Sequence, residues 1–545
     1  MAAHLSAQIP GAARTMNRGA THGGRVLSMA GGTAASRLSG LLRVLVLAWV
    51  LGFTPLADAF NLANTIPNML FDLVIGGVLS ATFIPVVVER LALDGERRAW
   101  RSISTVVTAA VVVLMVASGL SWIFAPWIID GFTFLQHTSN ATQLHALHAQ
   151  RRVATEFLRW FVPQIFFYGV IGIATALLNV RRKFAIGSWA PVANNIIAIA
   201  VLVWFHLVDP VPSVASLSGS SDLWWLGLGT TAGVAVQFIV MWPSLVKSDL
   251  GRLRLRFDVH DPALRTIGRL GAWTLMVVIA NQASLYVVLA FAFGTGGSGP
   301  VSAYTYGWSF MQMPYAVVVV SVLGVLTPQL AEFSTRGDLQ SLSERLSFGL
   351  RQSLVIIIPS TVAMIILAQP LVGILLNHLN DSTQLPAGTV LAILAAGLPG
   401  FTLFQLCVRG LQAMQHARDV FALYALQNAA TIALCVTLGR HSLAGLTASV
   451  SIAYAVAAIA ALGVLAMRGV SVVSTVWSVH VRRSVYASLA MGLVMAAAWS
   501  TPTWTRGTGL VVRGTLAAAL GALTYVLFVL VAQRGSELDR RKVQG

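Results

Sequence analysis

The chain has 545 residues, of which 56% are hydrophobic and only 10% are charged. A soluble domain carries about 25% charged residues, so this composition excludes a soluble globular protein, a disordered chain and a collagen-like fibre. It indicates an all-α polytopic membrane protein. The formal net charge is +17, but most of the cations lie in short loops between apolar runs, where they set membrane topology; we therefore expect no nucleic-acid partner.

Apolar runs long enough to cross a bilayer, about 20 residues each, predict the transmembrane helices. The first run carries arginines inside its apolar part, which argues against a cleaved signal peptide. We predict fourteen helices, near residues 26–51, 58–90, 102–125, 153–180, 187–208, 223–246, 263–293, 300–331, 343–368, 388–414, 419–438, 443–467, 484–501 and 509–532.

The distribution of Lys and Arg predicts the orientation. One set of alternate connecting segments holds 27 of the 36 cations and the other set holds five. Positive charge is retained on the cytoplasmic side, so both termini are predicted to be cytoplasmic. We expect residues 1–25 and 534–545 to be cytoplasmic tails, the first of them disordered.

A weak internal repeat predicts two lobes. Pro85 is followed by Glu89 near the end of the second helix, and Pro328 is followed by Glu332 near the end of the eighth. Prolines in the fourth and tenth helices repeat at a similar offset. We therefore predict pseudo-symmetric six-helix lobes at 26–246 and 247–467, followed by two extra transmembrane helices at 468–533.

Ionisable residues at membrane depth mark candidate functional positions because they are costly there. Arg37 and Arg43 lie about 18 and 27 Å along the first helix and about 120° apart around it, so they could flank one wide cavity. The alternative is a structural salt bridge to a neighbouring helix. Arg409 in the tenth helix is interpreted as reaching the cytoplasmic surface instead.

The second helix carries a polar face. Its six polar side chains fall within an arc of about 120° at 100° per residue, which predicts a cavity wall or gate, or alternatively a hydrogen-bonded seam with the first helix. These residues are Asp58, Asn61, Asn64, Thr65, Asn68 and Asp72. Gly76, Gly77, Pro85 and Pro328 are candidate hinges, because glycine pairs and prolines permit helices to bend.

Sequence signatures of an ATPase, a metal site or a serine hydrolase are absent from the chain. We expect no cofactor, no bound metal and no catalytic residue. A transporter without its own ATPase would use an ion gradient or the membrane potential.

Several motifs resemble the MurJ/MviN family of the multidrug/oligosaccharidyl-lipid/polysaccharide exporter superfamily. They are SRLSGLLR from Ser36, LADAF from Leu56, IPN from Ile66, GGVLSATFIPV from Gly76 and MPYAVVVVSVLGVLTPQL from Met313. The resemblance implies a flippase in the bacterial plasma (inner) membrane. Such a flippase moves lipid II, the undecaprenyl-pyrophosphate-linked peptidoglycan precursor, to the outer leaflet by alternating access.

The resemblance also implies site roles and partners. Arg37 and Arg43 match the two helix 1 arginines that hold the pyrophosphate, and Asp58 matches an aspartate of helix 2. Ser309 stands where the family has an arginine, and Gln312 where it has a glutamate; both are candidate cavity-lining or gating residues. The last two helices would accommodate the polyprenyl tail. Membrane lipids and cell-wall synthesis proteins are the expected partners.

Two alternatives remain open at this point. One is an exporter of another lipid-linked oligosaccharide or of drugs, although a drug-cation exporter would need an acidic cavity and this one begins with two arginines. The other is a membrane enzyme or a non-transporting scaffold of the envelope machinery. A polyprenyl-phosphate transferase would carry a catalytic acid or base beside a large outer loop, and none is apparent; a scaffold would not need arginines inside the membrane.

Overall fold

The computed structural model describes residues 12–73, 95–136, 140–181, 183–248, 255–256, 258, 262–297, 299–375, 381–500 and 508–544. All regular secondary structure within these ranges is helical, which confirms the all-α class. Eleven of the described helices are long and apolar enough to cross a membrane, or twelve when one bent pair is counted as a single span. The count of fourteen stays a prediction.

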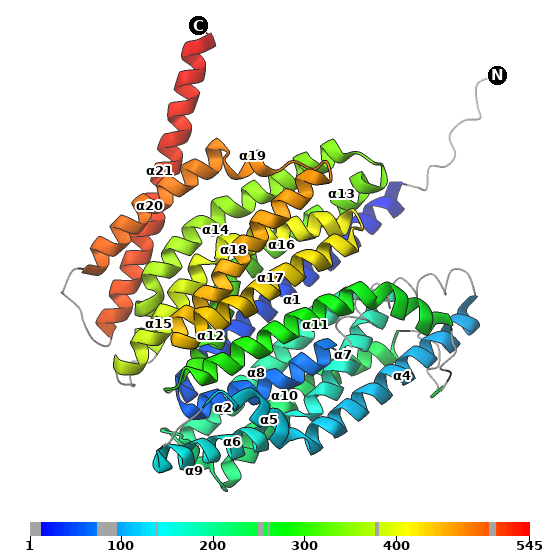
Figure 1. Ribbon diagram of the computed structural model, residues 1–545. Helices are drawn as coiled ribbons and strands as arrows, with labels where there is room; N and C mark the ends of the chain where they lie inside the picture. Colours follow the sequence, from blue (N-terminus) through cyan, green and yellow to red (C-terminus); the bar gives the residue numbers. More distant parts are fainter. Residues whose placement is uncertain are drawn as a thin grey trace.

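The first half of the chain forms one bundle, in which α2 packs against α6 and α7, and α10 packs against α8 (Figure 1). Its helices are α1 (Ala12–Leu51), α2 (Pro55–Phe71), α4 (Gly95–Ile123), α5 (Ala125–Thr133), α6 (Ala141–Phe161), α7 (Pro163–Val180), α8 (Phe184–Val208), α9 (Val214–Leu217) and α10 (Ser221–Val246).

The second half forms another bundle, in which α14 packs against α13, α15 and α16, and α18 against α16 and α17. Its helices are α11 (Pro262–Gly294), α12 (Pro300–Pro314), α13 (Val320–Thr335), α14 (Leu339–Leu375), α15 (Asp381–Ala396), α16 (Leu398–Ala413), α17 (Ala417–Thr437), α18 (Leu443–Met467), α19 (Val473–Val476), α20 (Val479–Ser500) and α21 (Thr508–Gln544). The pair α20 and α21 lies against α14 at the edge of this bundle (Figure 1).

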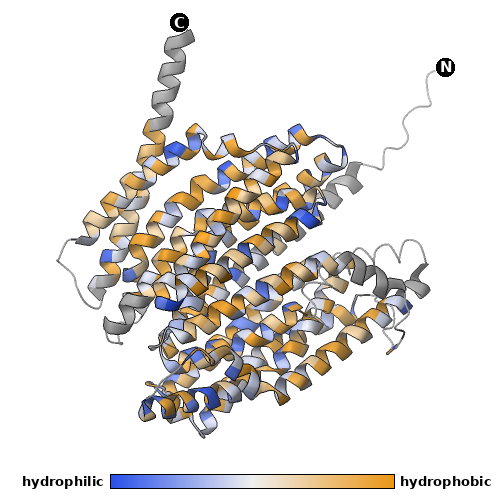
Figure 2. Ribbon diagram, viewed as in Figure 1, coloured by the Kyte–Doolittle hydropathy of each residue, from blue (hydrophilic) through white to orange (hydrophobic). Residues whose placement is uncertain are grey.

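Hydrophobic residues predominate along most of the helices of both bundles, as the colouring of Figure 2 shows. Large apolar residues such as Leu207, Ile459 and Leu493 are more than 70% exposed. Such exposure is costly in water and favourable in lipid, so these faces are those of a multi-pass membrane protein.

Helix breaks in the two bundles occur at comparable prolines. Pro163 starts α7 directly after the α6 helix, and Pro399 lies in the first turn of α16 after a 43° bend at Gly397. A proline lacks the N–H that would continue the preceding helix, so both breaks follow from the sequence. The lobe boundaries stay predictions.

Two of the predicted segments differ from the helices found. Helix α1 already begins at Ala12 and α21 continues to Gln544, so helix extends into both ranges expected to be tails. Six alanines within residues 12–35 favour helix there, although five glycines in the same range oppose it. Of the candidate hinges, Pro328 lies inside α13, whereas Gly76, Gly77 and Pro85 lie outside the described residues.

Candidate functional site

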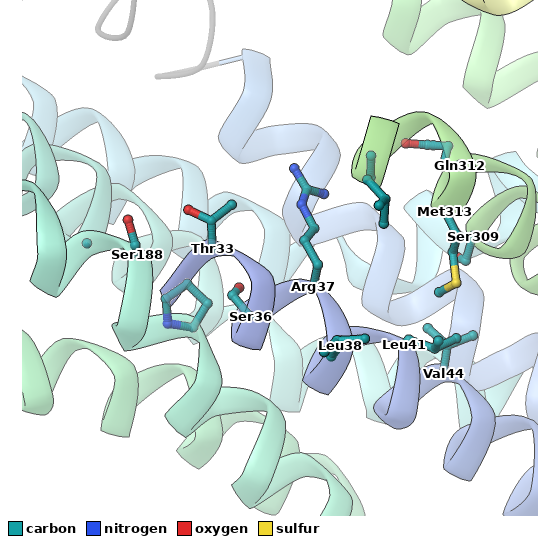
Figure 3. A pocket seen from close by; sticks show the side chains of 15 residues that line it. Thr33, Ser36, Arg37, Leu38, Leu41, Val44, Ser188, Ser309, Gln312 and Met313 are labelled. Atoms are coloured by element: carbon teal, nitrogen blue, oxygen red, sulfur yellow. The ribbon is translucent and has the colours of Figure 1, made fainter. Parts of the chain in front are cut away.

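A cavity of about 450 Å³ lies between the two bundles, with Arg37 in its wall (Figure 3). The Arg37 side chain extends away from α1, and Ser309 and Gln312 lie on the facing helix α12. Helix α8 supplies a third wall. The cavity is lined by Thr33, Ser36, Arg37, Leu38, Gly40, Leu41, Val44, Gly187, Ser188, Pro191, Ser309, Gln312, Met313, Ala316 and Val317.

Arg43 lies in the wall of a second, smaller cavity of about 90 Å³. Val44 and Ser309 line both cavities, so the two arginines face adjoining spaces rather than one. The reason is helical geometry: six residues advance the chain by about 9 Å and turn it by about 120°. This turn brings Arg43 to the side where Asn61 and Asn64 of α2 also line the second cavity.

Among the described residues, no carboxylate pairs with either arginine. Within the described part of the chain, no ion pair and no hydrogen bond involves Arg37 or Arg43. Arg37 is exposed and Arg43 is half-buried. A fixed guanidinium group without a counter-charge attracts an anion, and its planar donors match phosphate oxygens.

The bundles are joined at one end by a buried hydrogen-bond cluster. The backbone N–H and the hydroxyl of Ser302 both donate to Asp58 Oδ1, at 2.7 and 2.8 Å. The Asn61 amide donates to the Ser302 hydroxyl at 3.0 Å. All three residues are buried. Asp58 therefore holds the start of α12 against the start of α2.

Backbone packing tightens the same end. Gly299 precedes α12 with a φ of +84°, and a Cβ placed on it would lie 2.5 Å from the carbonyl carbon of Phe53. Only glycine fits such an approach at positive φ. The rings of Phe53 and Tyr306 meet at 5.6 Å across the same junction. We call these residues, together with Asp58, Asn61 and Ser302, the closed end.

The remaining polar residues of α2 differ in what they contact. Asn64 lines the second cavity, the Thr65 hydroxyl donates to the Asn61 carbonyl, and the exposed Asn68 donates to the Asn64 carbonyl. Asp72 accepts a hydrogen bond from Gln282 of α11 at 3.1 Å. Within the described residues, interhelical hydrogen bonds from this face reach α12 and α11, whereas toward α1 the face lines a cavity.

Helix α11 is hydrogen-bonded to helices of both bundles. Gln282 donates to Asp72 of α2, and its neighbour Asn281 accepts from Asn428 of α17 at 2.7 Å. Tyr286 donates to the Gly131 carbonyl of α5. Any separation of the bundles must therefore stretch or break one of these contacts.

One wall of the first cavity has irregular backbone. A π-helical turn, Tyr315–Val319, joins α12 to α13, and Ala316 and Val317 of this turn line the cavity. Such turns are rare and occur frequently at functional sites. Neither this turn nor Ser302 could be predicted from the sequence, because neither has a distinctive local pattern.

The arrangement defines a class of protein: an α-helical membrane transporter of two bundles, closed at one end, with arginines lining cavities between them. The described fold is similar to a solved lipid II flippase MurJ in an inward closed conformation, with a TM-score of 0.74 and 20% identity, covering 93% of this chain and 99% of that one. It is also similar to an inward-facing multidrug resistance transporter of the MATE family, with a TM-score of 0.65 and 14% identity, covering 81% of this chain and 96% of that one.

Sequence comparison narrows the class. The family model described as lipid II flippase MurJ matches residues 47–513. A lipid II flippase MurJ of Burkholderia cenocepacia is 29% identical over 406 residues, covering 72% of this chain and 73% of the relative. A probable lipid II flippase MurJ of Rhizobium meliloti is 26% identical over 422 residues, covering 75% and 74%. The chain belongs to the lipid II flippase MurJ family.

Proposed function

We propose that this protein moves lipid II from the cytoplasmic to the outer leaflet of the bacterial plasma membrane by alternating access between the two bundles. Family membership supports the substrate. The observation that carries the mechanism is the position of Arg37, exposed in a cavity between bundles and without a described counter-charge.

The chemistry of the substrate matches this site. A pyrophosphate is a multivalent anion, and each guanidinium group can donate two parallel hydrogen bonds to its oxygens. Arg37 would bind the pyrophosphate from the first cavity, and Arg43 would bind part of it from the second. Val44 and Ser309 line both cavities, so these side chains would have to move for one headgroup to contact both arginines.

The closed end supplies the gate in this mechanism. Asp58 is buried against Ser302 at the end of the bundles where α1 finishes, and this end faces outward if the predicted topology holds. The headgroup would enter from the cytoplasm, and the Asp58–Ser302 contact would then break to release it on the outer side. Both termini would lie in the cytoplasm.

Depletion of the protein in living cells tests the proposal. Lipid II in the outer leaflet can be measured with an external reagent that modifies its headgroup and does not cross the membrane. We expect the modified fraction to fall several-fold on depletion and to recover with the wild-type chain but not with Arg37→Ala. An unchanged fraction of modified lipid II would contradict the assignment. Accumulation of a different lipid-linked glycan would favour the exporter alternative.

A further inference from the structure

A polar face of α16 is not used by the site described above. Gln405, Arg409 and Gln412 recur at intervals of four and three residues and so share one face of the helix. Arg409 is exposed, while its neighbours Val408 and Gly410 are buried. An exposed cation on a helix that is otherwise packed requires polar or aqueous surroundings.

Arg409 is hydrogen-bonded within α16 and lies within electrostatic range of the π-helical turn. Its Nη1 donates to Gln412 Oε1 at 3.0 Å, and none of the described ion pairs involves it. The Tyr315 hydroxyl of the π-helical turn lies within electrostatic range of both Arg409 and Arg37. Tyr315 directly precedes Ala316 of the cavity wall, so both guanidinium groups act electrostatically on this turn, from different bundles.

A third cavity, of about 300 Å³, adjoins this face. It lies between α11, the end of α16 and the start of α17. Tyr424, which lines it, donates to Gln405 at 2.9 Å and is also within electrostatic range of Arg409. The cavity is lined by Trp273, Thr274, Val277, Gln412, Gln415, Ala417, Val420 and Tyr424.

The lining groups have complementary chemistry. Trp273 is 38% exposed, which leaves apolar ring surface for the C–H face of a sugar. The amides of Gln412 and Gln415 can each donate and accept, as sugar hydroxyl and acetamido groups require. Gln415 also has a φ of +60°, a conformation that costs energy for any residue with a Cβ. The side-chain amide of Gln415 is thus present at a position where glycine would be less strained.

We propose that Trp273, Arg409, Gln412 and Gln415, which we call the α16 surface, bind the part of the substrate headgroup beyond the pyrophosphate. The ligand class is a carboxylate-bearing sugar–peptide: Arg409 pairs with a carboxylate, and Trp273 with the two amides receives a sugar. This subsite rests on the proposed function. It would divide recognition between the bundles, with the pyrophosphate on α1 and the glycan on α16.

The distinguishing experiment compares two ligands that differ only beyond the pyrophosphate. Dissociation constants for lipid II and for undecaprenyl pyrophosphate are measured on the purified protein in detergent. The variants are Arg409→Gln, Arg409→Lys, Trp273→Leu and Arg37→Gln. Arg418→Gln is the charge-matched control, because Arg418 is exposed on the adjacent helix and does not line the cavity.

We expect Arg409→Gln and Trp273→Leu each to weaken lipid II binding about tenfold while leaving undecaprenyl pyrophosphate within twofold. Arg409→Lys should retain part of the affinity, Arg37→Gln should weaken both ligands, and Arg418→Gln should change neither. The ratio of the two constants within one variant removes any general loss of folded protein, and Trp273→Leu tests the subsite even if Arg409→Gln does not fold.

Three results would overturn the subsite. Equal loss for both ligands in Arg409→Gln would assign Arg409 to the pyrophosphate. Unchanged lipid II binding in both variants, with wild-type binding intact, would remove the subsite and leave the flippase proposal standing. Competition of lipid II by phosphatidylglycerol in the wild type but not in Arg409→Gln would assign the surface to a membrane lipid. If the wild type binds neither ligand, the proposed function itself fails.

Discussion

Ser302 donates two hydrogen bonds to the same oxygen of Asp58, although the two residues are 244 positions apart in the chain. The contact joins the first turn of α12 to the first turn of α2, and both side chains are buried. Because it lies between the bundles, its strength sets how readily this end of the protein opens.

Replacing Asp58 by alanine should open the closed end. It leaves two buried donors of Ser302 without their acceptor, which costs about 1–3 kcal/mol, and each 1.4 kcal/mol is about a tenfold change in an equilibrium. Thr305, one turn further along α12, lines the second cavity and would report the opening as a cysteine. We expect Thr305→Cys to react at least several-fold faster with a membrane-impermeant maleimide in the Asp58→Ala background.

For this measurement the two native cysteines, Cys407 and Cys435, which are both buried, are first replaced by alanine, so that only the introduced cysteine can react. Ser302→Ala is the graded control, since it removes the hydroxyl and keeps the backbone donor. It should give an intermediate labelling rate. Equal rates in all three proteins would show that the contact does not hold the closed end.

Gly299→Ala should weaken the same end for a different reason. The methyl group would meet the Phe53 backbone and would also sit at positive φ. Gly296→Ala is a matched control, because Gly296 also has positive φ and has nothing within 4 Å of its Cβ position. We expect Gly299→Ala to raise Thr305→Cys labelling and lower transport, and Gly296→Ala to cost only modest thermal stability. Similar behaviour of the two variants would refute the close approach at Phe53.

The amide pair between α11 and α17 should contribute to stability. Asn428, which is buried, donates to Asn281, so Asn428→Ala leaves the Asn281 oxygen without this donor at a cost of about 1–3 kcal/mol. Thermal unfolding in detergent should show a lower midpoint for either single alanine variant. The double variant should lose less than the sum of the two, as coupled partners do. Strict additivity would mean that the hydrogen bond contributes nothing measurable.

Much of the architecture could be predicted because it follows from local rules. The length of the apolar runs predicts the membrane helices, and the helical rotation of 100° per residue predicts the polar face of α2. The partner of that face could not be predicted, since Ser302 looks like any other serine until the fold brings it to Asp58. Proline positions alone do not predict where helices break, since Pro328 lies inside α13 whereas a 43° bend precedes Pro399, where Gly397 lies close to Ser451 of α18.

The positions of the arginines could likewise be predicted only in part. Their depth and their angular separation follow from helix geometry, yet the assignment of Arg37 and Arg43 to adjoining cavities depends on α8, α2 and α12. The height of Arg409 along its helix alone predicts a side chain that reaches the cytoplasmic surface. Its electrostatic interaction with Tyr315, and the cavity lined by Gln412, depend on helices distant in sequence.

The central claim is that cations in the cavities between the bundles bind a pyrophosphate, and equilibrium binding of undecaprenyl pyrophosphate to the purified protein tests it most directly. Arg37→Gln and Arg43→Gln should each weaken binding at least tenfold, since one charge-assisted hydrogen bond contributes about 1.5–3 kcal/mol. Arg37→Lys should recover part of that loss, because lysine keeps the charge without the paired donors. Wild-type affinity in both glutamine variants, with the wild type binding the ligand, would contradict the account.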